Sequence, residues 1–128
     1  MTVVPAEEPV DRRWPRSVYG VGDEPDPRFT FANERTFLAW IRTGLAFLTA
    51  GVALTTIAGL LPGRELLAHV AAAVLVVCGV LSGVVALARW ARNEKALRLQ
   101  RPLPSSPALL LLTGTLVLVA VIAVVVLV

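Results

Sequence analysis

The chain has 128 residues, of which 56% are hydrophobic, and its formal net charge at pH 7 is +3. Its apolar residues gather in long runs, and the composition excludes an ordinary soluble globular domain. A spanning helix takes ~20 apolar residues to cross a hydrocarbon core of ~30 Å, so we predict an all-α membrane domain over residues 26–128, with three transmembrane helices at about 28–61, 65–99 and 107–128.

Residues 1–25 precede the first apolar run and are predicted to form a disordered cytosolic tail. Prolines at positions 5, 9, 15 and 25 interrupt a stretch of mixed charge, and such a segment is too polar to bury a core. The tail has no apolar stretch of the kind found in cleavable signal peptides. We therefore expect the first spanning helix to direct membrane insertion.

The first membrane helix is predicted to begin at Asp26-Pro27, with Asp as the N-cap and Pro at the first helical position. It enters the bilayer near Trp40, a residue suited to the membrane boundary. Polar side chains recur every seven residues along it, at Arg28, Arg35, Arg42, Thr49 and Thr56. Seven residues are almost two helical turns, so these side chains share one face. A charge at bilayer depth is costly, and this face is predicted to meet protein or water.

Residues 31–46 read FANERTFLAWIRTGLA, which resembles the signature of a small bacterial membrane family known as DUF202 or YidH-like. The motif is also similar to the membrane domain of the eukaryotic vacuolar transporter chaperone. The resemblance extends over residues 28–44 and returns in the basic segment 89–104. It implies a ring-like homo-oligomer, for instance a pentamer, in the plasma (inner) membrane. In the chaperone, basic side chains at the matching positions, Arg28 and Arg35 here, face a central polyphosphate path. Arg42 has no basic counterpart in the eukaryotic motif.

The second helix follows a short turn at residues 61–65, LPGRE. So short a link predicts an antiparallel hairpin with the first helix. Gly79 and Gly83 form a GxxxG pattern, which lets helices approach closely. The first helix offers a second seam of small residues at Gly44, Gly51 and Ala58, offset from the arginine face.

Basic residues set the expected orientation. Five lie in the basic segment 89–101 that leads from the second helix into the second connection, namely Arg89, Arg92, Lys95, Arg98 and Arg101, against Arg64 alone in the first turn. The positive-inside rule places the N-terminus and the second connection in the cytosol and the C-terminus outside. The same rule accounts for the net positive charge, so no nucleic-acid partner is predicted. Ser106-Pro107 is predicted to start the third helix, whose uniformly apolar surface places it outermost, against lipid.

The arginine face leads to the main functional hypothesis. A ring of copies would stack Arg28, Arg35 and Arg42 over ~21 Å of helix rise into a cytosol-facing basic vestibule. Guanidinium groups suit phosphate-type anions, and Arg92 and Arg98 would add to the site. Two alternatives remain open. The arginines could anchor the chain to anionic lipid headgroups, or the protein could be an accessory or scaffold subunit for another membrane protein.

An enzyme is not expected. The sequence shows no nucleophile–base constellation, no spacing of metal ligands and no phosphate-binding glycine loop, so neither a cofactor nor a metal is predicted. Asn33, Glu34 and Thr36 form the most polar cluster. We interpret them, with Trp40, as structural contacts at the helix start and between subunits.

Overall fold

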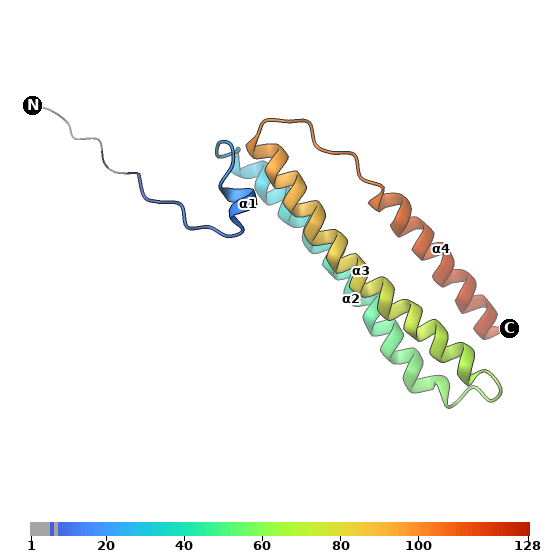
Figure 1. Ribbon diagram of the computed structural model, residues 1–128. Helices are drawn as coiled ribbons and strands as arrows, with labels where there is room; N and C mark the ends of the chain where they lie inside the picture. Colours follow the sequence, from blue (N-terminus) through green and yellow to red (C-terminus); the bar gives the residue numbers. More distant parts are fainter. Residues whose placement is uncertain (1–5, 7) are drawn as a thin grey trace, which may run out of the picture.

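The computed structural model describes residues 6 and 8–128, and the described part is helical, without strands. Figure 1 shows its four helices: α1 (Arg16–Tyr19), α2 (Pro27–Ala58), α3 (Glu65–Arg98) and α4 (Ala108–Leu127). Of the described helices, α2, α3 and α4 are long and apolar enough to cross a membrane, so the predicted fold class of three spanning helices is confirmed. Residues 1–5 and 7 of the predicted tail lie outside the described residues.

The helix termini follow local sequence signals. The Asp26 carboxylate accepts a hydrogen bond from the backbone N–H of Arg28 at 2.9 Å, and Pro27 is the first helical residue of α2. This is the predicted cap, and it satisfies a donor that the first helical turn leaves free. At α4, the Ser106 hydroxyl oxygen accepts from the N–H of Ala108 at 3.2 Å, although the helix itself begins one residue after the predicted Pro107.

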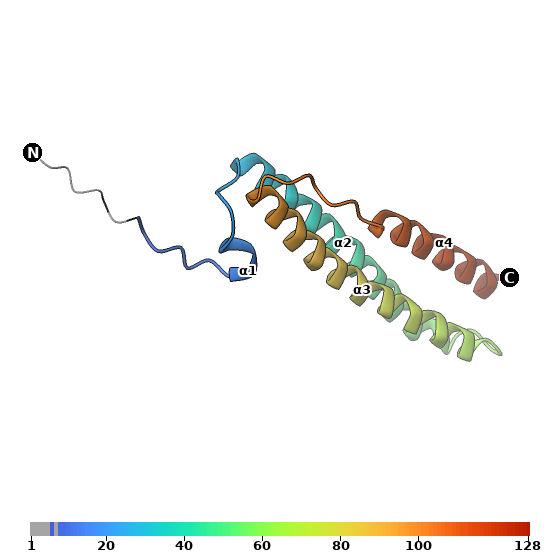
Figure 2. The same cartoon turned by 45° about the horizontal axis from the view of Figure 1, so that its top comes forward.

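The long helices α2 and α3 form an antiparallel hairpin, and they lie side by side along their lengths in Figures 1 and 2. The buried residues along this contact are mostly small and recur every seven positions. Among them are Gly44, Gly51 and Ala58 on α2, and Ala72, Gly79 and Ala86 on α3. Such spacing keeps one face of each helix against its partner. The seam predicted on the first helix is therefore the contact inside the hairpin.

Of the two glycines in the GxxxG pattern of α3, one lies at the close contact with α2. A Cβ atom on Gly79 would lie 2.7 Å from Leu48 Cγ and 2.9 Å from the carbonyl oxygen of Gly44, whereas one on Gly83 would meet nothing within 4 Å. Only Gly79 lies at the close approach of the two backbones.

The last helix fixes the level of the membrane. Ala108, the first residue of α4, packs in one cluster with Trp40 of α2 and Ala86 of α3. Near its other end, Arg64 in the α2–α3 turn donates to the carbonyl oxygen of Val126 at 2.8 Å. The 20 residues of α4 rise ~30 Å, which matches a hydrocarbon core.

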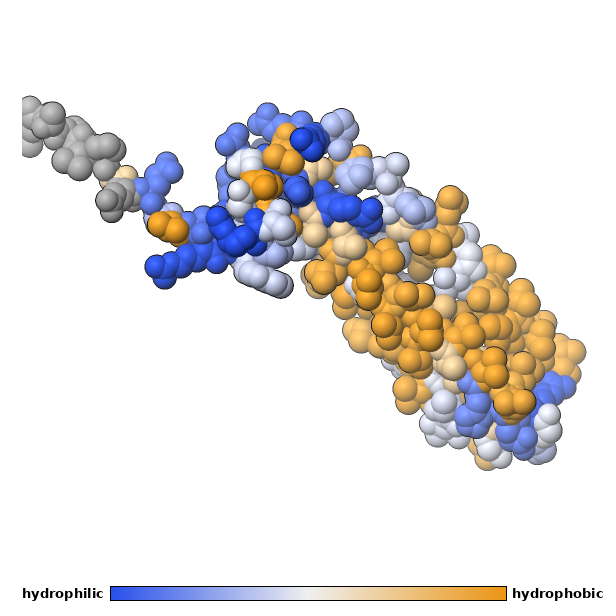
Figure 3. All heavy atoms as spheres, in the orientation of Figure 1, coloured by the Kyte–Doolittle hydropathy of each residue, from blue (hydrophilic) through white to orange (hydrophobic). Residues whose placement is uncertain are grey.

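Because α2 begins 13 residues before Trp40 and α3 ends 12 residues after Ala86, the hairpin extends ~18–20 Å beyond the span of α4. We call residues 27–39 and 87–98 the projecting end. Figure 3 shows hydrophilic residues gathered at this end and again at the α2–α3 turn, with an apolar band between them.

Candidate functional site

The predicted arginine face lies on the outer side of α2. Arg28, Arg35 and Arg42 are exposed, as are Thr49 and Thr56 farther along. Arg28 pairs with Asp26 at 3.3 Å, and none of the four ion pairs among the described residues involves Arg35 or Arg42. The threonines turn their hydroxyls back to the helix, donating to backbone carbonyl oxygens of Leu45 and Val52. Within one chain, neither α3 nor α4 covers this face.

The arginines sit at different depths. Arg28 and Arg35 belong to the projecting end, whereas Arg42 lies two residues past Trp40, ~3 Å into the span of α4. An arginine at that depth reaches the headgroups with its long side chain. All three guanidinium groups are therefore accessible at or above the membrane surface.

The two arginines of α3 that were predicted to add to the anion site differ in their exposure. Arg92 is exposed, and its Nε approaches the carbonyl oxygen of Ala88 at 3.4 Å. Arg98 is only 5% exposed, and its guanidinium already has acceptors within the protein. We therefore assign Arg98 a structural role and leave it out of the proposed anion-binding surface.

Arg98 holds the segment before α2 against the end of α3. Its Nε donates to the carbonyl oxygen of Val21 at 2.9 Å, and one terminal nitrogen donates to that of Tyr19 at 3.1 Å. The other nitrogen pairs with the Glu24 carboxylate at 3.1 Å. In return, the N–H of Asp23 donates to the Arg98 carbonyl oxygen at 2.9 Å. We call residues 13–25, held in this way, the N-terminal strap.

A second arginine reinforces the strap. Arg13 pairs with Glu24 at 2.6 Å and lies over the ring of Tyr19, 4.8 Å from its centroid. The Tyr19 ring in turn packs against Trp90 of α3, with centroids 6.2 Å apart. Hydrogen bonds from Arg13, and then from Arg98, lower the pKa of Glu24 to about 2. The carboxylate is thus charged at neutral pH and joins both arginines.

Replacing Arg98 by alanine is expected to release this strap while leaving the hairpin folded. Each hydrogen bond to a charged group contributes ~1.5–3 kcal/mol, so amide hydrogen exchange over residues 16–24 should become at least about ten-fold faster. Hydrogen-exchange mass spectrometry in nanodiscs measures this. Arg101→Ala removes the same charge from an exposed position nearby and should leave the exchange unchanged. Equal protection in both variants would show that other contacts hold the strap.

A buried polar cluster joins α2 to α3 inside the projecting end. Glu94 is 1% exposed, and it accepts hydrogen bonds from the Thr30 hydroxyl at 2.9 Å and from the Asn33 amide at 3.2 Å. The same Asn33 amide donates to the carbonyl oxygen of Trp90 at 3.0 Å, and Asn93 donates to Asn33 Oδ1 at 3.3 Å. These contacts of Asn33 join the first part of α2 to α3 within one chain, and the contacts predicted between subunits stay a prediction.

The remaining predicted residues do not share one site. Trp40 is 8% exposed and lies beneath the Arg89 guanidinium, 5.8 Å from its ring centroid, so it packs inside the protein at the membrane boundary. Thr36 is exposed and donates to the carbonyl oxygen of Ala32. Glu34 is exposed beside an apolar groove.

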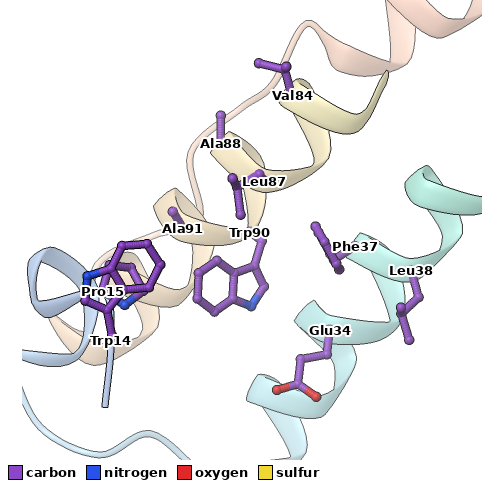
Figure 4. A pocket seen from close by; sticks show the side chains of 10 residues that line it. All are labelled: Trp14, Pro15, Glu34, Phe37, Leu38, Val84, Leu87, Ala88, Trp90 and Ala91. Atoms are coloured by element: carbon purple, nitrogen blue, oxygen red, sulfur yellow. The ribbon is translucent and has the colours of Figure 1, made fainter. Parts of the chain in front are cut away.

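This groove has a volume of about 790 Å³ and lies between the strap, α2 and α3. Figure 4 shows the side chains that line it, which are apolar except for one carboxylate: Trp14, Pro15, Glu34, Phe37, Leu38, Val84, Leu87, Ala88, Trp90 and Ala91. No sequence pattern predicts the groove, because its walls come from three segments that are separated along the chain.

Comparison with known proteins supplies the family context. The profile of a domain of unknown function, DUF202, matches residues 28–96. The chain is 49% identical to the inner membrane protein YidH of Escherichia coli (strain K12) over 108 residues, which covers 80% of this chain and 88% of that protein. It is 45% identical over 86 residues to an uncharacterized protein of Mycobacterium tuberculosis (strain H37Rv), covering 66% of this chain and 68% of the relative. No solved structure matches the chain.

Proposed function

The chain belongs to the DUF202 family and is a multi-pass inner membrane protein, and we propose that the arginine face of α2 binds phosphate-bearing anions at the membrane surface. One observation carries the proposal. Arg28, Arg35 and Arg42 are exposed on a single face that none of the described helices covers.

The chemistry of the face suits phosphate. A guanidinium group presents a planar fork of N–H donors that can bind two phosphate oxygens at once, and it stays charged at any physiological pH. Arg35 and Arg42 lie outside the ion pairs among the described residues. An incoming anion therefore displaces no internal partner from these two side chains.

Assembly of several copies would convert the face into a vestibule. The face of α2 opposite the hairpin contact is uncovered in a single chain, so helices from neighbouring copies can meet there. Their arginines would stack as rings over ~21 Å, in the manner of charged rings that select anions. Polyphosphate is a candidate ligand, since the motif in residues 31–46 resembles that of the vacuolar transporter chaperone.

A second candidate function follows from the depth of Arg42 in the membrane. Because Arg42 lies level with the start of α4, its side chain reaches the layer where phospholipid phosphates lie. In this case a single copy binds anionic headgroups, and the protein serves as an accessory or scaffold subunit for another membrane protein. Both functions rest on the same arginine–phosphate chemistry, and they differ in whether the phosphate belongs to lipid.

Arg35→Glu tests the proposal, because it reverses the sign at the centre of the face. We expect binding of inorganic polyphosphate to protein in nanodiscs of neutral lipid to weaken at least about ten-fold, since a charge-assisted pair is worth more than 1.4 kcal/mol. Arg101→Glu carries the same change of net charge at an exposed position outside the face and should retain most of the binding. Microscale thermophoresis provides the affinities.

Three outcomes distinguish the vestibule from lipid anchoring and from an arginine face without a special role. Polyphosphate binding in neutral nanodiscs, together with a stable homo-oligomer by native mass spectrometry, supports the vestibule. Binding only to vesicles that contain phosphatidylglycerol, by a protein that stays monomeric, supports lipid anchoring. Loss of binding in Arg101→Glu equal to that in Arg35→Glu would contradict both, because the face would then have no special role.

A further inference from the structure

The apolar groove beside the projecting end has no arginine among its lining residues. We propose that it binds the acyl chain of a membrane phospholipid with a primary ammonium headgroup, and that the N-terminal strap forms its outer wall. The inference does not depend on anion binding by the arginine face of α2.

The level of the groove identifies a lipid as its occupant. Its lining residues run from Val84, within the span of α4, to Ala91, five residues beyond Ala86. The groove therefore begins in the hydrocarbon layer and ends in the headgroup layer. Leu38, Val84 and Leu87 in its walls are each 56–61% exposed. An acyl chain of the same leaflet that extends into the groove covers these side chains. Their apolar surface is thereby removed from water.

Charges at the mouth of the groove complement a zwitterionic headgroup. Glu34 is the one carboxylate among the lining residues, and it lies outside the ion pairs among the described residues. Figure 4 shows Glu34 on α2, with Trp90 between it and the strap residues Trp14 and Pro15. Lys95 is exposed one turn beyond Ala91 on the same face of α3. A headgroup with an ammonium beside Glu34 and a phosphate beside Lys95 satisfies both charges.

The strap completes the groove on its aqueous side. Trp14 and Pro15 line it, and the contacts of Arg13 and Arg98 hold this segment in place. Trp14 remains 83% exposed, and an indole at this level is typical of the membrane interface, where it contacts both acyl chains and headgroups. Without the strap, the groove would open directly to water.

Photocrosslinking tests the proposal on the full chain in nanodiscs, with phosphatidylethanolamine that carries a diazirine in one acyl chain. Peptide mass spectrometry compares adducts on the groove residues Leu87 and Trp90 with adducts on Leu116 and Val117, which are exposed on α4. We expect groove adducts to saturate as the fraction of the probe rises, while adducts on α4 grow in proportion to it. Proportional growth at both places would overturn the proposal.

A matched pair of variants checks the location. Ala88→Phe fills the groove from an exposed lining position and should reduce groove adducts several-fold relative to α4. Ala73→Phe makes the same change at an exposed position of α3 outside the groove and should leave the ratio unchanged. If Ala88→Phe keeps the adducts and instead alters the oligomeric mass, the groove is a protein contact and the lipid assignment fails.

The headgroup assignment has its own control. Glu34→Gln should reduce the advantage of a phosphatidylethanolamine probe over a phosphatidylcholine probe in labelling the groove, because a neutral amide no longer pairs with the ammonium. A preference that survives this substitution would remove Glu34 from the site.

Discussion

Replacing Gly79 by alanine is expected to destabilise the α2–α3 hairpin, whereas the same change at Gly83, four residues later, is expected to be neutral or mildly stabilising. At Gly79 the new methyl group would lie 2.9 Å from the carbonyl oxygen of Gly44 and 2.7 Å from Leu48 Cγ. A backbone oxygen cannot move aside without separating the helices, and overpacking of this kind costs ~1–3 kcal/mol. At Gly83 the methyl group meets nothing within 4 Å, and alanine favours a helix by up to ~1 kcal/mol over glycine.

Unfolding in mixed micelles with increasing SDS, followed by loss of helical circular dichroism, measures both variants. Gly51→Ala provides a second test on the facing helix, since its Cβ would lie 2.9 Å from Val76 Cγ2 and 3.0 Å from the carbonyl oxygen of Ala72. Equal stability of the Gly79 and Gly83 variants would show that the hairpin does not depend on close backbone approach.

These glycines also show which helix contacts the sequence predicts and which it does not. Long apolar runs and a five-residue turn are local features, and they predicted the three spanning helices. The Asp26-Pro27 pair is also local, and it predicted the start of α2. The seven-residue spacing of Gly44, Gly51 and Ala58 predicted a seam, which the structure places inside the hairpin. The spacing of Gly79 and Gly83 could not reveal that only one of them lies at the contact, because that depends on how α2 is rotated against α3.

The polar contacts were harder to predict, for a different reason. Arg98 lies in a basic segment, where composition favours an exposed side chain, yet its acceptors are 74–79 residues away in the strap. Hydrophobic periodicity carries no information about such pairs. One signal was present: Glu94 is the single acidic residue among the basic residues 89–101. An isolated carboxylate in such a segment suggests a specific partner, although the sequence does not say which.

Glu94→Ala is expected to lower stability by ~2–4 kcal/mol, since it removes two hydrogen bonds to a charged group and leaves buried donors unsatisfied. Thr30 would lose its acceptor and the Asn33 amide one of its two acceptors, and both residues lie at the α2–α3 contact in the projecting end. Glu94→Gln keeps the size and one carbonyl oxygen, so we expect an intermediate loss. The SDS unfolding experiment gives both values.

Glu65→Ala serves as the control, because Glu65 is an exposed carboxylate at the opposite end of the same helix. Exposed substitutions of this kind change stability by no more than ~0.5 kcal/mol. The comparison tests whether the projecting end is held by a sealed polar cluster. If Glu94→Ala costs as little as the control, water enters between α2 and α3 there and satisfies the donors of Thr30 and Asn33. The two helices would then be free to separate above the membrane, and neither the arginine face nor the groove would have a rigid support.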